Sequence, residues 1–332
     1  MPKVLPLEWS LVRLLVMSPT EKDDQLAALS RDVLNAFDAV NGGVHAGFRP
    51  AHAKGIMLSG AFTPAPGATS LTRAPHLSRA STPVSVRFSD FAGIPTIPDN
   101  DPNASPRGFA VRFHLDGDAY TDIVGHSTDG FPTRTAEELA EFLRAIAASG
   151  PNAPKPTPIE SFLATHPAAL EFVQAPKPFP SSFAKESFFG VNAYKFTNAA
   201  GAVRFGRYRI RPDGGGDYLS AEAAAAKSAN YLIEEIKERV AKGSVKMHIV
   251  VQLAEPGDIV DNSTIHWPAN RPQQEFGTIS LTALMPNNEA AQRDFITDVI
   301  PRVDGIDPSD DPLLEARAAV YLMSGRRRAA AK

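Results

Sequence analysis

The chain has 332 residues, of which 43% are hydrophobic and 21% charged, so it can bury a substantial core. Its formal net charge of −3 gives no basic footprint for nucleic acid, and no run approaches the roughly 18–20 apolar residues that a membrane span needs. The absence of cysteine excludes disulfides, thiol catalysis and thiolate ligands. The lack of cysteine and of a recognisable secretory signal predicts a cytoplasmic protein.

The first half of the chain is predicted to contain one helix followed by several strands. A helix is expected over residues 20–40, where apolar side chains recur at helical spacing, and Asn41-Gly42-Gly43 is expected to end it. Residues 60–82 are rich in proline, serine, threonine and alanine, which indicates a loop. Alternating apolar side chains predict strands over residues 83–88, 107–115 and 122–124.

The predicted strand over residues 107–115 has two different faces. One face carries large apolar side chains, which are Phe109, Val111, Phe113 and Leu115. The other face carries Gly108, Ala110, Arg112 and His114. The two small residues on that face would let something flat and bulky lie close to the strand's backbone.

The second half of the chain is predicted to be mainly helical, with strands between the helices. Capping residues and helical spacing predict helices that begin after Thr135, after Thr157, over residues 221–242, over residues 288–300, and from Asp311 to Gly325. Strands are expected over residues 204–211, 246–253 and 277–284. This order of elements favours an α+β fold around a sheet or barrel over a series of βαβ units.

Two short motifs near opposite ends of the chain could carry chemistry. His52 lies three residues after Arg49 and just before Gly55, and Tyr321 lies four residues after Arg317 in the last predicted helix. Side chains four residues apart share a helix face, so Arg317 could favour the anionic form of a phenol that binds a metal ion. A neutral imidazole can accept and return a proton near pH 7. Each motif alone is weak, because a single histidine or Arg/Tyr pair is usually structural.

Several segments together resemble one known family. In chain order they are Val44–Gly55, Thr82–Ser89, Ser105–Phe113, Asp122–Gly125, Val303–Ser309 and Arg317–Tyr321. In this order they are similar to the haem catalases, specifically to the short catalase-related peroxidases. The resemblance is dense over residues 44–131, looser over residues 260–325, and poor over residues 135–245.

The resemblance implies a fold and a cofactor. The fold it implies is α+β, with an antiparallel β-barrel core, peripheral helices and a C-terminal proximal helix. The chain would divide into an N-terminal helical arm over residues 1–43 and a catalase-like haem-binding domain over residues 44–332. The implied cofactor is haem b with ferric iron, and tyrosine is the haem ligand of catalases.

The resemblance also implies roles for the residues of the motifs. His52 is expected to be the distal acid–base that moves a proton between the two oxygens of peroxide. Ser89 is expected to orient the imidazole of His52. On the proximal side, Tyr321 is expected to ligate the iron, and Arg317 is expected to support the phenolate.

Other residues are expected to hold the cofactor or to alter the distal side. Arg49 and Arg107 are expected to pair with the haem propionates, a bidentate role that suits guanidinium. Phe131 is expected to pack near the distal pocket. Where the family has a Gly-Asn-Asn-Thr run, this chain has Gly125-His126-Ser127-Thr128, so His126 takes the place of the distal carboxamide. An imidazole is bulkier than a carboxamide and titrates near neutral pH.

The predicted function is a haem-dependent peroxidase that uses hydrogen peroxide to oxidise small organic donors, with weak catalase activity. The replaced carboxamide and the short chain, which should leave the haem edge open, both favour an organic reductant over a second peroxide. Three alternatives stay open: a monofunctional catalase, an enzyme that converts lipid hydroperoxides, and a non-catalytic haem-binding protein. The expected partners are hydrogen peroxide and small organic reductants, with no nucleic acid and no membrane, and a homodimer is also considered.

Overall fold

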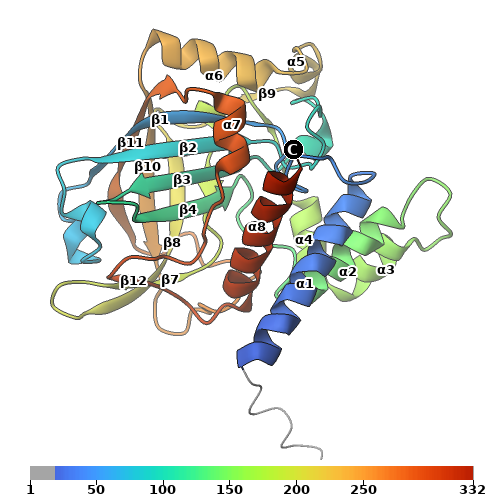
Figure 1. The fold of residues 1–332 in the computed structure, drawn as a ribbon, viewed down its shortest axis with the longest axis horizontal. Helices are drawn as coiled ribbons and strands as arrows, with labels where there is room; N and C mark the ends of the chain where they lie inside the picture. Colours follow the sequence, from blue (N-terminus) through green and yellow to red (C-terminus); the bar gives the residue numbers. More distant parts are fainter. Residues whose placement is uncertain (1–18, 332) are drawn as a thin grey trace, which may run out of the picture.

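The computed structural model describes residues 19–331, and its α+β architecture confirms the predicted fold class (Figure 1). Within these residues, eight antiparallel strands close into a barrel in the order β10-β11-β1-β2-β3-β4-β6-β8, because β8 pairs back to β10. The bounds of these strands are β1 Gly55–Pro64, β2 Thr82–Ser89, β3 Gly108–His114, β4 Tyr120–His126, β6 Phe188–Phe189, β8 Val203–Pro212, β10 Val245–Leu253 and β11 Gln273–Leu284. The remaining strands are β5 Phe179–Pro180, β7 Tyr194–Thr197, β9 Tyr218–Leu219 and β12 Ile306–Pro308.

Large apolar side chains fill the interior of the barrel. The apolar faces predicted for β2 and β3 point into the barrel, since Val86, Phe88, Phe109 and Phe113 are each at most 2% exposed. The rings of Phe88 and Phe109 lie 5.6 Å apart between their centroids, in the edge-to-face geometry that aromatic pairs favour. The opposite face of β3, with its small residues, therefore points out of the barrel.

The helices form a second layer on one side of the barrel. Figure 1 shows α8 beside the barrel, with α1 and α2 on the side of α8 away from the strands. A separate hydrophobic cluster joins these three helices through Val33, Ala36, Ala136, Ala140, Leu143, Leu313 and Ala316. The helices are α1 Pro19–Val40, α2 Ala136–Ala147, α3 Pro158–Thr165, α4 Pro167–Gln174, α5 Ala221–Ala225, α6 Tyr231–Lys242, α7 Asn288–Asp294 and α8 Pro312–Ala330.

The predicted capping residues begin three of these helices. The Thr135 hydroxyl accepts the Glu138 amide at 3.2 Å at the start of α2. At the start of α3, the capping box between Thr157 and Glu160 has both of its hydrogen bonds. The carboxylate of Asp311 accepts the amide of Leu313 at 3.0 Å and begins α8. None of the described helices is long and apolar enough to cross a membrane.

Two predictions are wrong in part, one for a loop between strands and one for a helix in the middle of the chain. The expected loop over residues 60–82 begins as strand, because β1 continues to Pro64 through a bulge at Gly60. A Cβ at Gly60 would lie 2.1 Å from the Ser280 carbonyl oxygen, so glycine is what allows β11 to approach. The helix expected over residues 221–242 is two helices, α5 and α6.

Two further helix ends were predicted wrongly near the C-terminus. The helix expected over residues 288–300 ends with α7 at Asp294. The last helix does not end at Gly325 but continues to Ala330. Gly325 is a packing residue, since a Cβ there would lie 2.2 Å from Cδ1 of Ile296. Of the expected N-terminal arm over residues 1–43, the part before residue 19, including the segment inspected for a secretory signal, lies outside the described residues.

Candidate active site

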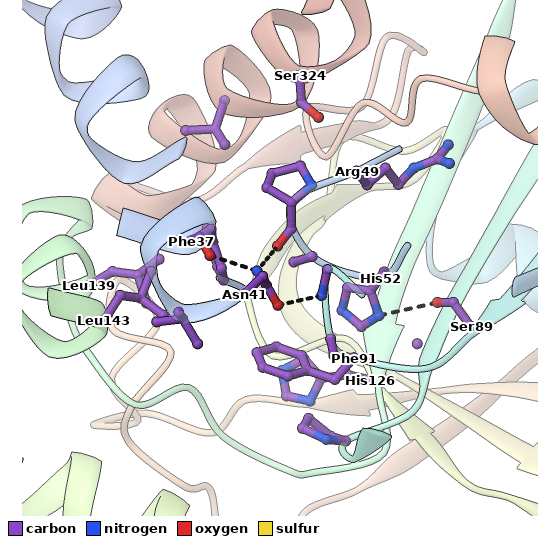
Figure 2. Close-up of a pocket in the computed structure, with 18 of the residues that line it drawn as sticks. Phe37, Asn41, Arg49, His52, Ser89, Phe91, His126, Leu139, Leu143 and Ser324 are labelled. Atoms are coloured by element: carbon purple, nitrogen blue, oxygen red, sulfur yellow. Dashed lines mark hydrogen bonds between the residues drawn. The ribbon is translucent and has the colours of Figure 1, made fainter. Parts of the chain in front are cut away.

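A cavity of ≈ 810 Å³ lies between strands β3 and β4 of the barrel and helices α1, α2 and α8 (Figure 2). Most of its wall is apolar. Seven of the eight predicted site residues line it, namely Arg49, His52, Ser89, His126, Phe131, Arg317 and Tyr321. Gly108 and Ala110 on the outward face of β3 line it too, as expected for small residues that leave room beside the backbone.

His52 is held firmly on one wall of the cavity. Its amide donates to the Phe91 carbonyl at 2.6 Å, and its Nδ1 lies 3.1 Å from the Ser89 hydroxyl, as Figure 2 shows. The Phe91 ring meets the imidazole edge-on, with 5.4 Å between centroids. Burial, reinforced by the positive charge of Arg87, lowers the pKa of His52 to about 3, so the ring is neutral at pH 7.

The pairing of His52 with Ser89 depends on Gly108. A Cβ on Gly108 would lie 2.5 Å from Nδ1 of His52 and 2.4 Å from Oγ of Ser89, so any side chain there would push the two apart. Gly108 pairs with Ser89 across the β2–β3 ladder, which places it under the contact. The glycine that begins β3 therefore has a direct function in the site.

His126 lies at the end of β4, next to Gly108 in the ladder. Its Nδ1 accepts the backbone N–H of Thr128 at 3.3 Å, so the neutral ring carries its proton on Nε2. Burial, followed by the nearby charge of Arg317, lowers the pKa of His126 to about 3. Nε2 is buried and has no hydrogen-bond partner among residues 19–331. The site thus contains a neutral N–H donor whose acceptor is not part of the described chain.

On α8, Arg317 and Tyr321 form the opposite wall. The guanidinium Nε and Nη2 of Arg317 donate to the Tyr321 phenol oxygen at 3.2 and 2.9 Å. Arg317 also donates to Asn192, whose amide donates to Asp311 at 2.8 Å. Burial tends to lower the pKa of Arg317, but the phenols of Tyr321 and Tyr194 outweigh it and the pKa is raised. The guanidinium therefore stays charged beside the phenol oxygen.

Three further arginines, Arg49, Arg87 and Arg328, crowd together on the cavity wall. Burial lowers the pKa of all three, Arg87 to about 9 and Arg328 to about 10. Repulsion within the group lowers the pKa of Arg49 and Arg87 further, and the charge of Arg327 does so for Arg328. No carboxylate of the described residues forms an ion pair with any of them, and they donate mainly to backbone carbonyls, those of Phe295, His52 and Ala53 among them. Such a cluster is suited to bind an anionic group.

Arg107 requires a correction, because the structure places it away from the cavity. Its side chain is fully buried, forms an ion pair with Asp90, and donates to the carbonyls of Ala104 and Asp99. Lys54 joins the same buried cluster through an ion pair with Asp99. Arg107 thus neutralises a buried carboxylate and is not available to a ligand in the cavity.

Arg87 and Arg328 are the site residues that sequence reasoning missed, although both follow from periodicity. Arg87 precedes Ser89 by two residues in β2, so the two share one face of the strand. Arg328 follows Tyr321 by seven residues, two turns along α8, and shares its face.

Comparison with known proteins supports one family. The sequence model of the catalase family matches residues 47–332. The chain is 34% identical to a catalase-related peroxidase of Synechococcus elongatus, over 89% of this chain and 87% of that protein. It is 32% identical to a catalase-related peroxidase of Mycolicibacterium paratuberculosis, over 88% of this chain and 93% of that protein.

Solved structures show the same fold. A fungal catalase and catalase A from Saccharomyces cerevisiae each superpose with a TM-score of 0.76 at 22% identity, over 94% of this chain. The chain spans 63% and 65% of those two longer chains. The fold, the family match and the two relatives of similar length agree. The chain belongs to the catalase family.

Proposed function

We propose that the chain is a haem-dependent peroxidase, which uses hydrogen peroxide to oxidise small organic donors and has weak catalase activity. The observation that carries the proposal is that one cavity has the His52–Ser89 pair on one wall and the Arg317–Tyr321 pair on the other. The two relatives named catalase-related peroxidase, similar over most of their length, support the same activity. The family match and the two relatives make the protein an oxidoreductase that acts on peroxide.

The residues that line the cavity fit a haem, and we propose that it is ferric haem b. Tyr321 would ligate the iron, with its phenolate stabilised by the charge of Arg317. The arginine cluster of Arg49, Arg87 and Arg328 would bind the two propionates, which supply the anions that the cluster lacks in the chain itself. The described residues contain no His/Cys/Asp/Glu cluster that could hold a metal directly, which agrees with iron held by a phenol and a porphyrin.

A bound haem would supply the iron that binds peroxide and exchanges electrons with it. His52 does the proton chemistry. Its neutral ring accepts a proton from the first oxygen of peroxide and returns it to the second, so the O–O bond can break with water as the leaving group. Ser89 holds Nδ1 and thereby aims Nε2 into the cavity. The organic donor then supplies two electrons, and two protons complete the second water.

His126 is the second polar group on the same side. Its Nε2–H can donate to a peroxide oxygen, as the carboxamide of a catalase would, but from a ring of different reach. A second peroxide needs two well-placed partners to act as the reductant, and a misplacement of about 1 Å can cost on the order of 10²-fold in rate. An organic donor needs only access to the cofactor. The histidine therefore favours peroxidase over catalase turnover.

The alternatives differ in what they need from the site. A monofunctional catalase is less favoured by the two relatives and by His126. A lipid hydroperoxide would find an apolar wall, and Ile146 and Val173 line the cavity while 36% and 46% exposed. A protein that only binds haem would need Tyr321 but not the His52–Ser89 pair. A cytoplasmic location and a homodimer remain predictions.

The test compares the two fates of peroxide in the haem-loaded protein. Oxygen release is followed with an electrode, and oxidation of a phenolic or dye-like donor is followed by absorbance, at equal peroxide concentration. We expect donor oxidation to be the faster process. Vigorous oxygen release without donor oxidation would make the protein a small true catalase, and no reaction of either kind would support a haem-binding protein.

A further inference from the structure

Asn41, the residue that follows α1, lies on the cavity wall close to the loop that carries His52 (Figure 2). Its side chain makes three hydrogen bonds to backbone groups of three different segments. Nδ2 donates to the Phe37 carbonyl at 2.6 Å and to the Pro50 carbonyl at 2.8 Å. Oδ1 accepts the Gly93 amide at 2.9 Å. One side chain thus joins helix α1 to two loops of the barrel.

The two loops are those that carry the peroxide-facing pair. Pro50 precedes His52 by two residues, and Gly93 follows Ser89 by four. The loops also contact each other directly, since the amide of Ala53 donates to the Ala92 carbonyl at 3.0 Å. Asn41 clamps the same two loops from the side of the helix. Any shift of one loop relative to the other would change the distance between His52 and Ser89.

The backbone at His52 needs such support. Its φ is 60°, in the left-handed region that residues other than glycine rarely adopt. A strained residue keeps this conformation only when its surroundings fix it, and such residues cluster at functional sites. After His52, the chain is held by the backbone hydrogen bond from Ala53 to Ala92. Before His52, the Pro50 carbonyl accepts from the side-chain amide of Asn41. Without the amide, the segment before His52 would lose its bond at Pro50.

The position accepts only a carboxamide. Two carbonyl oxygens need donors and one amide N–H needs an acceptor, and among short side chains only asparagine supplies two N–H donors together with an acceptor. The fit is tight, because a Cβ on Gly93 would lie 2.3 Å from the Pro50 oxygen and 2.6 Å from Nδ2 of Asn41. Aspartate would keep the acceptor but would place a negative charge against two carbonyls.

We propose that Asn41 is a positioning residue for His52, which holds the distal imidazole at the distance from the cofactor that peroxide cleavage requires. The proposal rests on the proposed role of His52. It also assigns α1 a function beyond packing, because the helix ends at the residue that fixes the loop. Asn41 itself touches no reacting atom and acts only through the histidine.

The test is a double-mutant cycle on the haem-loaded protein. The variants are Asn41→Ala, Asn41→Asp, His52→Ala and the His52→Ala/Asn41→Ala pair. The control is Asn198→Ala, because Asn198 also makes three side-chain bonds to backbone groups, of Ser70, Ala200 and Ala202, but outside the cavity. The rate constant for the reaction with hydrogen peroxide is measured by stopped flow, together with haem content and the KM for the donor.

We expect both Asn41 variants to lower that rate constant about 10- to 100-fold, the scale of a misplacement of about 1 Å. Haem content and the donor KM should stay at wild-type values, and Asn198→Ala should react normally. Adding Asn41→Ala to His52→Ala should have no further effect, since Asn41 acts through the histidine.

Other outcomes overturn the proposal in distinguishable ways. A His52→Ala variant that reacts at the wild-type rate would show that the proposed function of His52 is wrong. If His52→Ala reacts slowly with hydrogen peroxide but the Asn41 variants react at the wild-type rate, the proposed function of His52 holds and the role of Asn41 is refuted. Additive losses in the double variant would also refute it. Loss of haem or of folding in both Asn41 variants, with Asn198→Ala intact, would show a role in general stability only.

Discussion

Arg317 and Tyr321 lie one helical turn apart on α8, and two nitrogens of the guanidinium reach the phenol oxygen at 3.2 and 2.9 Å. The guanidinium also donates to the side chain of Asn192, which in turn donates to Asp311, and these two hydrogen bonds fix its position. The charged guanidinium would stabilise the phenolate that the proposed iron ligand requires.

The first prediction is that Tyr321→Phe removes the iron ligand. The variant keeps the ring and its packing but lacks the oxygen, so haem affinity should fall and the ferric absorption spectrum should change. Haem content per chain after reconstitution and the visible spectrum measure this. Arg317→Lys is a useful companion, since it keeps a charge but loses the paired contact. Full haem content with an unchanged spectrum in Tyr321→Phe would assign the iron to another ligand.

A second prediction contrasts two buried arginines, Arg87 in β2 and Arg107 just before β3. Arg87→Ala should weaken haem binding about tenfold or more, because a charge-assisted contact to a propionate is lost, and should cost about 1–3 kcal/mol of folding stability, because the carbonyls of His52 and Ala53 lose their donor. Arg107→Ala should destabilise the fold by roughly 3–5 kcal/mol, because the buried Asp90 keeps only its longer, 3.8 Å ion pair with Lys54. Haem titration and thermal unfolding separate the two effects. Equal effects of both variants on haem affinity would restore Arg107 as a propionate ligand.

Strand periodicity points to Arg87 as a candidate ligand of the propionates, whereas the family motif points to Arg107. Arg107 lies in the more recognisable motif. A motif does not show where a side chain points, however, and here the buried carboxylate of Asp90 binds the guanidinium in place of a ligand in the cavity. Asp90 is remote from Arg107 in sequence, and the pairing of β2 with β3 brings them together. Period-two alternation from Ser89, by contrast, already places Arg87 on the same face.

The helix over residues 221–242 shows the limit of local propensity. Alanine-rich sequence favours one continuous helix, but the chain breaks between α5 and α6. The Ala229 carbonyl there accepts the Asp99 amide and Lys54 Nζ, both at 2.8 Å, and the Asp99 carboxylate accepts the Leu232 amide at 2.7 Å. These contacts come from distant segments and override the local preference. The capping residues of α2, α3 and α8, whose partners are local, were predicted correctly.

A third prediction concerns His126. His126→Asn should raise oxygen release relative to donor oxidation, because the carboxamide restores a distal donor of the reach found in catalases. His126→Phe is the matched control, since it fills the space next to Phe131 and Phe172 without a donor. It should not raise oxygen release. Identical product ratios in wild type and His126→Asn would mean that His126 does not decide between the two reductants.

A fourth prediction is a loss of stability in acid. Burial lowers the pKa of His52, His76 and His126 to about 3, against an ordinary value near 6.5, so between these values the unfolded chain binds more protons than the folded one. Their contribution is complete above about pH 6.5 and is lost as the pH falls toward 3. Burial raises the pKa of Asp90 and Glu186 to about 7, and these carboxyls act in the opposite direction, so the histidine contribution is measured as the change in the slope of thermal stability between pH 4.5 and 7.5 when a histidine is replaced.

His76 offers the control for the acid effect, because it lies in the barrel among Phe62, Phe113 and Phe276 and outside the cavity. His76→Phe should make the slope shallower by up to about 1.4 kcal/mol per pH unit, the value for one proton. An unchanged slope in this variant would show that His76 is not buried in its neutral form.

We infer that His52 is the acid–base of peroxide cleavage in a cavity where Tyr321 ligates the iron; this role of His52 can be measured. It is tested most directly by the stopped-flow rate at which hydrogen peroxide changes the absorption of the haem-loaded protein, in wild type and in His52→Ala. We expect a loss of about 10²–10⁴-fold with haem content unchanged, because a positioned acid–base is not a ligand of the iron. A His52→Ala protein that reacts at the wild-type rate would contradict it.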